Sequence, residues 1–417
     1  MPNMVLESPG VDQKPGPVSR SPLAGRVDTQ PRKRVAFLFN AQRHQLLHGV
    51  TSAVALARDW DADVRILSPN AEHLTYARDL AERYSPGSPL RFEEIGSPLL
   101  NLICSALGWT VPPKLLTLLL ASRGLSSYDA IVLPERTSTI MRWFGVKRPK
   151  LVHIDHGAGD RAVGFDRRIR KFDFVMMPGD KHKRRLFAEK LVSHGRSAVT
   201  GYPKFEAADL MRGDATPIFP RTRPVILYNP HFSASLGSWH RHGMEIVRGL
   251  AALSGFNLIV APHVRLFDNP HRRTEGTEAL AEIARLPNVY IDLGSDRSVD
   301  MTYTSLADIY VGDVSSQVYE FLRTPRPCLF VNSGRHRWQG DPNFAHWAFG
   351  PVIDSPNRIA DAISDAIGSH PAYRNAQSRG FAETFDLPPG TSSGARVAEA
   401  IARSMELAPS RTAGGRP

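Results

Sequence analysis

The feature that most constrains the fold of this chain is a repeated alternation between short apolar runs and longer amphipathic stretches. Short runs rich in branched aliphatic residues are typical of strands that are buried on both faces of a parallel sheet. In the first half of the chain we predict such strands at 35–39, 63–67, 130–133, 151–154, 174–177 and 198–201. The stretch at 45–58 is amphipathic, as expected of a helix that connects two parallel strands. The pattern therefore predicts a doubly wound α/β domain.

The alternation stops at a segment rich in Pro, Gly and Arg, residues 211–223, and then begins again. The second series predicts strands at 225–228, 258–261, 289–291, 309–311 and 328–331, and helices near 243–253, 278–285, 316–322 and 357–367. A length of 417 residues is enough for two domains that each bury a core. We therefore expect the α/β class, with two doubly wound Rossmann-like domains that face each other across a cleft. The expected boundaries are 1–33 for a disordered tail, 34–215 and 222–370 for the two domains, 371–406 for a helical segment that is a candidate to cross back, and 407–417 for a second tail.

The distribution of charge indicates the kind of partner. The net charge is +11, and between residues 142 and 185 thirteen Lys and Arg stand against five Asp. Such a region favours an anionic partner, either a phosphorylated substrate or an anionic membrane surface, although part of it is explained by an ordinary solvated face. Nucleic acid is not expected, because no aromatic residues alternate with the basic ones and no nucleic-acid-binding motif occurs.

Cysteine content and hydropathy indicate the compartment. Cys104 and Cys328 are far apart in the sequence, which suits a reducing environment and argues against a disulfide framework or a cysteine zinc site. No apolar run resembles a signal peptide or reaches the roughly 20 residues of a membrane-spanning helix. The most apolar segment, 99–121, is divided by Pro112 and Pro113, and it predicts either a buried helical hairpin or a helix that dips into a membrane surface. We expect a cytoplasmic protein, with contact at the inner face of the membrane as the open alternative.

The segment 308–322 has the form of a phosphate-binding site. A short apolar strand runs through a tight turn into a helix that opens with Ser315 and Ser316. The first N–H groups of a helix are unpaired and carry the positive end of its dipole, and small hydroxyl residues allow a phosphate to approach them. Glu320, one turn further on, is placed to accept hydrogen bonds from ligand hydroxyls. The alternative for this segment alone is an ordinary serine cap.

Histidines end several of the predicted strands. His156 ends the strand at 151–154 and is followed by Gly157, which lets a substrate come close, so we predict His156 as a general base. Asp155 and Asp160 are both candidates to orient its ring. Further polar residues follow the strands of the second series. His263 and Arg265 are predicted to supply charge-assisted donors to a diphosphate, and Asn229 and His231 to line the same wall. Gly157 and Arg161 are predicted to bind the substrate or donor as well.

The order of these motifs resembles the CDP-glycerol glycerophosphotransferase family, whose members build teichoic-acid-like polymers on a GT-B fold. The resemblance covers residues 151–331 and is carried by the motifs His156-Gly157, Thr200-Gly-Tyr-Pro-Lys204, Asn229-Pro-His231, Pro262-His263, Asp300 to Asp308, and Asp313-Val-Ser-Ser to Glu320. It implies that His156 is the catalytic base, with Asp160 beside it. It also implies that His263 binds the donor phosphate and that Asp313, Ser315, Ser316 and Glu320 hold the rest of the donor. No acidic pair has metal-ligand spacing, so neither a metal nor another cofactor is expected.

The resemblance implies a transferase that moves glycerol phosphate, or a related group, from a CDP-activated donor to a hydroxyl of an anionic or lipid-linked cell-envelope acceptor. The basic residues from Arg161 to Arg185 would then face that acceptor or its membrane. The chain departs from the family after Gly157, where it continues Ala158-Gly159-Asp160-Arg161 in place of a small residue, Pro, Leu and Lys. Two alternatives are therefore open. One is a nucleotide-sugar enzyme, either a GT-B glycosyltransferase or a UDP-N-acetylglucosamine 2-epimerase, and the other is a non-enzymatic protein that binds anionic surfaces.

Overall fold

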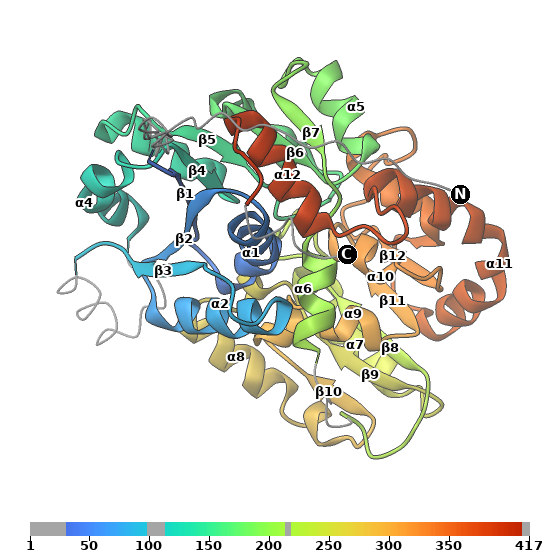
Figure 1. Cartoon of the computed structure of the whole chain (residues 1–417). Helices are drawn as coiled ribbons and strands as arrows, with labels where there is room; N and C mark the ends of the chain where they lie inside the picture. The colour runs from blue at the N-terminus through green and yellow to red at the C-terminus, as the bar shows by residue number, and fades with distance from the viewer. Residues whose placement is uncertain (1–30, 98–112, 213–217, 411–417) are drawn as a thin grey trace, which may run out of the picture. The chain divides into compact units, whose positions relative to one another are not determined.

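The computed structural model describes residues 31–97, 113–212 and 218–410 and is drawn in Figure 1. The expected tail at 1–33 lies almost entirely outside the described residues. So do most of the tail at 407–417, the part of 99–121 that precedes Pro113, and the centre of the linker at 211–223. From Lys33 onward the chain forms one compact unit with two parallel β-sheets. Two parallel sheets with interleaved helices confirm the predicted α/β class.

The first sheet has seven strands in the order β3-β2-β1-β4-β5-β6-β7, and every pairing is parallel. The strands are β1 (Lys33–Leu38), β2 (Ala62–Ser68), β3 (Arg91–Glu94), β4 (Ala130–Leu133), β5 (Lys150–His153), β6 (Phe174–Met177) and β7 (Ser197–Val199). Alternate residues of β1 enter different cores, with Val35 and Phe37 on one face of the sheet and Ala36 and Leu38 on the other. A sheet buried on both faces needs helices on both faces, as the doubly wound topology supplies.

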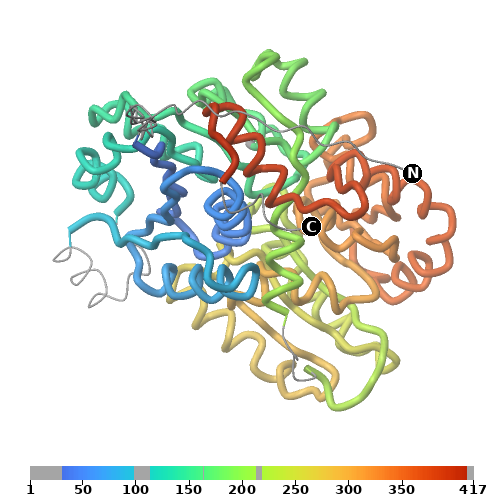
Figure 2. Tube along the Cα trace, viewed as in Figure 1, coloured from blue at the N-terminus to red at the C-terminus, as the bar shows by residue number. Residues whose placement is uncertain are grey.

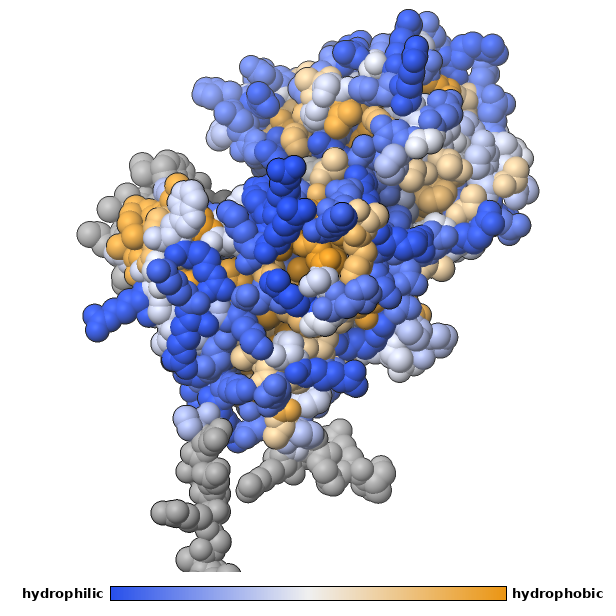
Figure 3. Space-filling view, turned by 90° about the horizontal axis from the view of Figure 1, so that it is seen from above, coloured by the Kyte–Doolittle hydropathy of each residue, from blue (hydrophilic) through white to orange (hydrophobic). Residues whose placement is uncertain are grey.

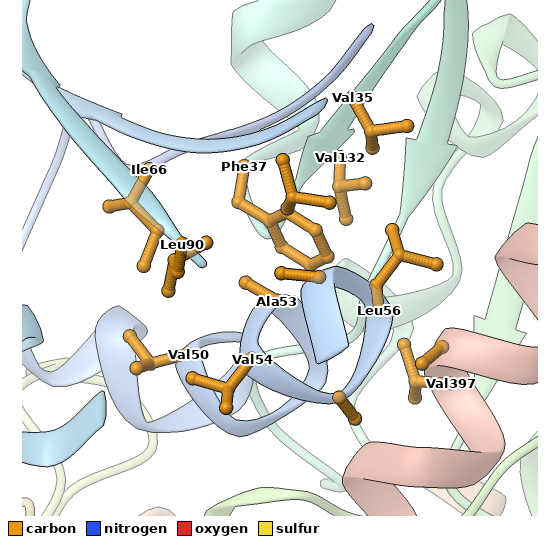
Figure 4. Packing of buried hydrophobic residues seen from close by; sticks show 14 of the residues in the cluster. Val35, Phe37, Val50, Ala53, Val54, Leu56, Ile66, Leu90, Val132 and Val397 are labelled. Carbon is orange, nitrogen blue, oxygen red and sulfur yellow. The ribbon is translucent and has the colours of Figure 1, made fainter. Parts of the chain in front are cut away.

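The helices of the first half are α-helices and short 3₁₀ helices. They are η1 (Arg43–His48), α1 (Val50–Asp59), α2 (Ala71–Tyr84), α4 (Lys114–Leu125), η2 (Arg136–Phe144), η3 (Ala162–Phe165), η4 (Arg167–Lys171), α5 (Asp180–Ala188) and α6 (Lys204–Met211). Figure 4 shows one face of the sheet, where Phe37 and Val132 point toward Ala53 and Leu56 of α1. This packing fixes the end of β1 and the start of η1 beside the carboxyl edge of the sheet.

The second sheet has six parallel strands in the order β10-β9-β8-β11-β12-β13. They are β8 (Val225–Asn229), β9 (Asn257–Val260), β10 (Val289–Ile291), β11 (Ile309–Gly312), β12 (Cys328–Val331) and β13 (Val352–Ile353). The helices of the second half of the chain are α7 (Trp239–Ala251), η5 (Val264–Leu266), α8 (Pro270–Leu280), η6 (Ile283–Arg285), η7 (Asp296–Ser298), α9 (Thr302–Leu306), α10 (Gln317–Phe321), η8 (Pro342–Phe349), α11 (Ile359–Thr384) and α12 (Ser393–Met405). Ile226 and Tyr228 pack on one face and Leu227 on the other, so this sheet is also covered on both sides.

The last helix returns to the first sheet. Val397 and Ile401 of α12 belong to the same core as Val35 and Phe37, and Figure 2 shows the C-terminal helix beside the N-terminal part of the tube. The core of the first half is therefore completed by a segment from the far end of the chain.

The elements that differ from the sequence prediction include α11 and β3. The helix expected at 357–367 continues as α11 to Thr384, through Pro371. Proline in a helix removes one backbone hydrogen bond, but the buried Gln377 anchors the continuation by donating to the carbonyls of Arg326 and Phe349. The edge strand β3 was not predicted, because its sequence Arg-Phe-Glu-Glu carries no apolar run.

The part of 99–121 that is described begins at Pro113 and forms most of α4. This helix exposes Leu115, Leu116, Leu119 and Leu120, and Figure 3 shows hydrophobic residues gathered on the side where Figure 1 places α4. Within the described ranges, no helix combines the length and the apolar character needed to cross a membrane. The helical hairpin and the membrane-surface helix both remain predictions for 99–121.

Candidate functional site

A cavity of about 850 Å³ lies where the carboxyl ends of strands from both sheets meet. Its walls are formed by the loops that follow β1, β4 and β5 in the first sheet and β8, β9 and β11 in the second. Ligands bind at this edge in open parallel sheets. Ten of the residues predicted from the sequence line the cavity: His156, Gly157, Asp160, Arg161, His231, His263, Arg265, Ser315, Ser316 and Glu320.

Asn229 and Asp313 do not line the cavity, which corrects the prediction that they contact a ligand. The Asn229 amide is buried and donates to the backbone carbonyl of Ala261 at 2.7 Å. The Asp313 carboxylate accepts hydrogen bonds from the backbone amides of His231 at 2.8 Å and Ser238 at 2.6 Å. Both side chains therefore hold the loop that follows β8 in place, and they act on the cavity only by positioning His231.

The imidazole of His156 is oriented by the backbone and by neither Asp155 nor Asp160. Its Nδ1 lies 2.7 Å from the carbonyl oxygen of Pro134, and because a carbonyl only accepts, this nitrogen carries the proton. In a neutral ring the other nitrogen, Nε2, then carries the lone pair, and it lies 3.9 Å from Oε1 of Glu135. This arrangement leaves a basic nitrogen at the cavity wall with a carboxylate beside it.

Glu135 is a site residue that the sequence analysis did not identify. It accepts hydrogen bonds from Lys114 Nζ at 3.1 Å and from Gln45 Nε2 at 2.6 Å. Burial opposes ionisation of this carboxyl, but the charge of Lys114, together with His156 and the hydrogen bonds, outweighs it and lowers the pKa to about 2. Glu135 is therefore an anion at neutral pH and can stabilise His156 once the imidazole has taken up a proton.

Asp160 is already fully engaged by protein groups. Its carboxylate accepts from Lys181 Nζ at 2.9 Å, from the Tyr319 hydroxyl at 2.7 Å, and from the His346 amide at 3.1 Å, with Nδ1 of the same ring at 2.9 Å. Burial raises the pKa of this carboxyl, but the charge of Lys181 and the contacts with His346 lower it below its ordinary value overall. Asp160 therefore links the loop after β5 to α10 and η8, which corrects the expectation that it orients His156.

Glycines bring the loop that carries His156 close to the serines of the second half. A Cβ atom built on Gly159 would lie 3.1 Å from Cβ of Ser316, and one on Gly157 would lie 3.7 Å from Ser316 Oγ. A side chain at either position would occupy the narrow space between the two loops. His156, Ser315 and Ser316 therefore line one cavity, although they belong to different halves of the chain.

Two arginines and two histidines form a cationic end of the cavity. Nη1 of Arg161 donates to Nε2 of His231 at 2.7 Å, and the guanidinium of Arg265 stacks on Phe232 at 4.3 Å. Burial, with the positive charge of the arginines, lowers the pKa of His231 to about 3 and that of His263 to about 4, so both rings are neutral near pH 7. Among the described residues, neither guanidinium forms an ion pair with a carboxylate. This end of the cavity is therefore suited to an anion.

Glu320 lies in a buried group at the boundary of the two halves. Its Oε1 accepts from Lys204 Nζ at 2.6 Å and from the Tyr202 hydroxyl at 3.1 Å. Its Oε2 is buried and has no hydrogen-bond partner among the described residues. One oxygen thus remains for a ligand hydroxyl, as the sequence analysis proposed.

The helix that follows Ser315 and Ser316 is shorter than predicted. It is α10, which contains five residues, and Gln317 donates its backbone N–H to Ser315 Oγ at 3.3 Å. A helix of little more than one turn has a small dipole, because the dipole grows as peptide units align along the axis. Most of the positive charge that a phosphate would meet therefore comes from Arg161 and Arg265.

The basic region at 142–185 contributes less to the cavity than expected. Of its thirteen Lys and Arg, only Arg161 lines the cavity. Several of the others are used within the protein, since Lys181 pairs with Asp160 and Arg184 pairs with Glu383. The cavity therefore gives little support to the expectation that the residues from Arg161 to Arg185 face an anionic acceptor, and their contact with an acceptor or its membrane stays a prediction.

The lining residues to which the sequence analysis gave no role include Asn40, His44, Glu135 and Lys204. Two of them could have been found, because Asn40 and Glu135 each follow a predicted strand in the way that His156 does. Lys204 ends the Thr-Gly-Tyr-Pro-Lys motif but was given no role. In the described part of the chain, no group of three or more His, Cys, Asp and Glu side chains is arranged to hold a metal ion.

Two Rossmann-type sheets with a polar cavity at their carboxyl ends define the GT-B class of fold. The sequence matches no protein-family model and no curated protein. Its structure is similar to one named as a UDP-N-acetylglucosamine 2-epimerase from Listeria monocytogenes, with a TM-score of 0.61 at 14% identity, covering 93% of this chain and 99% of the other.

Two further solved structures share this architecture. The structure of MnaA from S. aureus with UDP has a TM-score of 0.59 at 13% identity and covers 90% of this chain and 98% of the other. The wall teichoic acid polymerase TagF, as an H444N variant soaked with CDPG, has a TM-score of 0.56 at 14% identity and covers 90% of this chain and 89% of the other. At these identities the similarity establishes the GT-B fold.

Proposed function

We propose that the protein is a GT-B transferase that binds a nucleoside-diphosphate-activated donor in the cavity and uses His156 as the general base. The observation that carries the proposal is the pair of arginines, Arg161 and Arg265, which form no ion pair with a carboxylate among the described residues and line the same cavity as His156. A diphosphate that links a nucleoside to glycerol carries two negative charges, and two guanidinium groups match them.

The proposed reaction moves glycerol phosphate, or a related group, from a CDP-activated donor to an acceptor hydroxyl. The acceptor oxygen forms a bond to phosphorus while the phosphoanhydride bond breaks, and the hydroxyl proton passes to Nε2 of His156. The nucleoside monophosphate leaves with the electron pair of the broken bond. Arg161, Arg265 and the hydroxyls of Ser315 and Ser316 stabilise the charge that develops on it.

A nucleotide-sugar enzyme is the second candidate, and the carboxylates of Glu135 and Glu320 favour it. Transfer of a sugar passes through a transition state with positive charge at the anomeric carbon, which nearby carboxylates stabilise. Transfer of a phosphoryl group instead has a transition state with negative charge on the phosphoryl oxygens, which nearby carboxylates do not stabilise. Each of these glutamates is paired with a lysine, Lys114 or Lys204, which reduces the difference between the two reactions.

Thermal shift measurements with CDP-glycerol, CMP, UDP and UDP-N-acetylglucosamine test the proposal, because a ligand that binds the native state raises its melting temperature. We expect the cytidine ligands to stabilise the protein most. Selective stabilisation by the uridine ligands would contradict the proposal and favour the second candidate, a nucleotide-sugar enzyme. Stabilisation by none of the four ligands would favour the remaining hypothesis, a non-enzymatic protein that binds anionic surfaces.

Variants identify the groups responsible. Arg161→Ala and Arg265→Ala should each weaken nucleotide binding by about 10- to 100-fold, the effect of one charge-assisted hydrogen bond. Arg170→Ala is the matched control, because it removes the same charge from the same basic region but does not line the cavity. His156→Ala should bind nucleotide normally and lose turnover, whereas full turnover by this variant would refute its role as base.

A further inference from the structure

The cavity has a second end, around His156, whose electrostatics differ from those of the cationic end. Arg136 lines this part of the cavity, and its guanidinium donates to the backbone carbonyl of Gly164. Both lysines there have an opposite partner, with Lys114 at 3.1 Å from Glu135 and Lys204 at 2.6 Å from Glu320. These pairs cancel their charges at short range. In contrast to the end that contains Arg161 and Arg265, this end offers no uncompensated positive charge from its lysines.

Histidines of the same end are neutral as well. Burial, with repulsion from Lys204 and His156, lowers the pKa of His44 to about 3. Burial likewise lowers the pKa of His48 well below its ordinary value, and neither ring nitrogen of His48 has a hydrogen-bond partner among the described residues. His44 therefore adds hydrogen-bonding capacity to this end and no charge, and His48, which does not line the cavity, adds no charge behind it.

Two buried polar atoms without a hydrogen-bond partner belong to residues that line this end. Asn40 is 1% exposed, and although its Oδ1 accepts from Ser138 Oγ at 3.0 Å, its Nδ2 donates to none of the described residues. Glu320 is 5% exposed and its Oε2 is equally unpartnered. Asn40 and Glu320 both line the cavity. Since buried polar groups in folded proteins are almost always hydrogen-bonded, one free donor and one free acceptor here indicate a ligand that satisfies both.

We infer that the end of the cavity formed by Asn40, His44, Lys204 and Glu320 binds an uncharged, hydroxyl-rich acceptor, such as a sugar or another polyol. A hydroxyl donates and accepts, so one group can satisfy the amide of Asn40 and a neighbouring one Oε2 of Glu320. The phosphate group of an anionic acceptor offers hydrogen-bond acceptors only, so it would not satisfy the free oxygen of Glu320 and would meet that carboxylate with a like charge. The inference rests on the proposed function, in which His156 deprotonates one hydroxyl of this acceptor, and it narrows the expected acceptor class to a neutral one.

The test compares matched neutral and anionic probes on the full chain saturated with CMP. The probes are glucose against glucose 6-phosphate and glycerol against glycerol 3-phosphate, measured by isothermal titration calorimetry. We expect each neutral probe to bind at least about tenfold more tightly than its phosphorylated counterpart. Tighter binding of the phosphorylated probes, or binding of neither class, would overturn the inference. Because CMP binding is measured first, failure of the proposed function appears as loss of nucleotide binding and is distinguishable from failure of the acceptor assignment.

Two variants locate the site. Asn40→Asp keeps the shape and removes the donor, so it should weaken glucose binding about tenfold and leave the affinity for CMP unchanged. Arg161→Ala is the reverse control and should weaken CMP while glucose binding at saturating CMP is retained. Equal glucose affinity for Asn40→Asp and the unmodified protein would place the sugar elsewhere. If Asn40→Asp does not fold, His44→Gln provides the same comparison from the other side of this end.

Discussion

Replacing Asp160 with Asn tests whether this carboxylate supports the fold or takes part in the reaction. Asp160 is 4% exposed and accepts hydrogen bonds from Lys181, Tyr319 and His346. Asparagine keeps the shape but leaves the ammonium of Lys181 buried without a counter-charge. Breaking a buried ion pair in this way costs about 3–5 kcal/mol. At about 2 °C per kcal/mol for a chain of this size, the melting temperature should fall by about 6–10 °C.

A double-mutant cycle separates the pair from the rest of the network. Differential scanning calorimetry would be applied to Asp160→Asn, Lys181→Met and the double variant, with turnover measured on each. Lys181→Met leaves the carboxylate without its cation, whereas the double variant leaves neither charge unpaired. We therefore expect the double variant to be destabilised by at least about 1 kcal/mol less than the sum of the two single variants.

The same experiment can refute this account. An unchanged melting temperature for Asp160→Asn, together with loss of turnover, would show that the carboxylate acts in the chemistry and that its contacts contribute little to stability.

The pH dependence of stability gives a second check. Because the pKa of Asp160 in the folded state lies below its ordinary value, its contribution is complete above about pH 4 and is lost only as the pH falls further.

Three further predictions concern other parts of the molecule. Gly159→Ala should push its loop a few tenths of an ångström away from Ser316. We expect turnover to fall about tenfold with little change in melting temperature, and unchanged turnover would contradict the close approach of the two loops. Burial lowers the pKa of His153 and of His182 to about 3. Between pH 6.5 and 5 these rings take up a proton only in the unfolded chain, so each histidine should lower the free energy of unfolding by about 2 kcal/mol. Unfolding in urea at pH 7 and 5 measures this loss, and equal stability at the two pH values would refute it. Cys328 is buried, and burial raises the pKa of its thiol. Peptide mapping after iodoacetamide treatment should therefore find Cys328 unlabelled in the native protein and labelled in urea. Rapid labelling of the native protein would contradict the burial of Cys328.

Prediction from the sequence worked best where one local pattern decides the structure. The strands β4, β6, β10 and β12 begin and end where the apolar runs do, because a strand buried on both faces must be apolar throughout. Helix boundaries were less accurate. For α11 the sequence indicated an end before Pro371, but contacts with distant backbone carbonyls carry the helix to Thr384.

For the candidate site, the sequence indicated which residues reach the carboxyl edge of a sheet. His156, His263 and Ser315 were identified in this way because each follows a buried strand. The same reasoning applies to Glu135, which was overlooked because glutamate at a strand end is common and nothing local distinguishes it. Its role depends on Lys114 and His156, which are brought to it by the packing of separate loops.

The sequence alone determined the order of strands and turns along the chain, because this order depends on the hydrophobic period of neighbouring residues. The order in turn determines which side chains lie at the edge of each sheet. Which charges meet was decided by the tertiary structure. Asp160 stands four residues from His156, yet it binds Lys181 and Tyr319, while His156 lies beside Glu135. Electrostatic and hydrogen-bonding partners are chosen by distances of a few ångströms between segments that are far apart in the chain, and such distances exist only after the two sheets have packed.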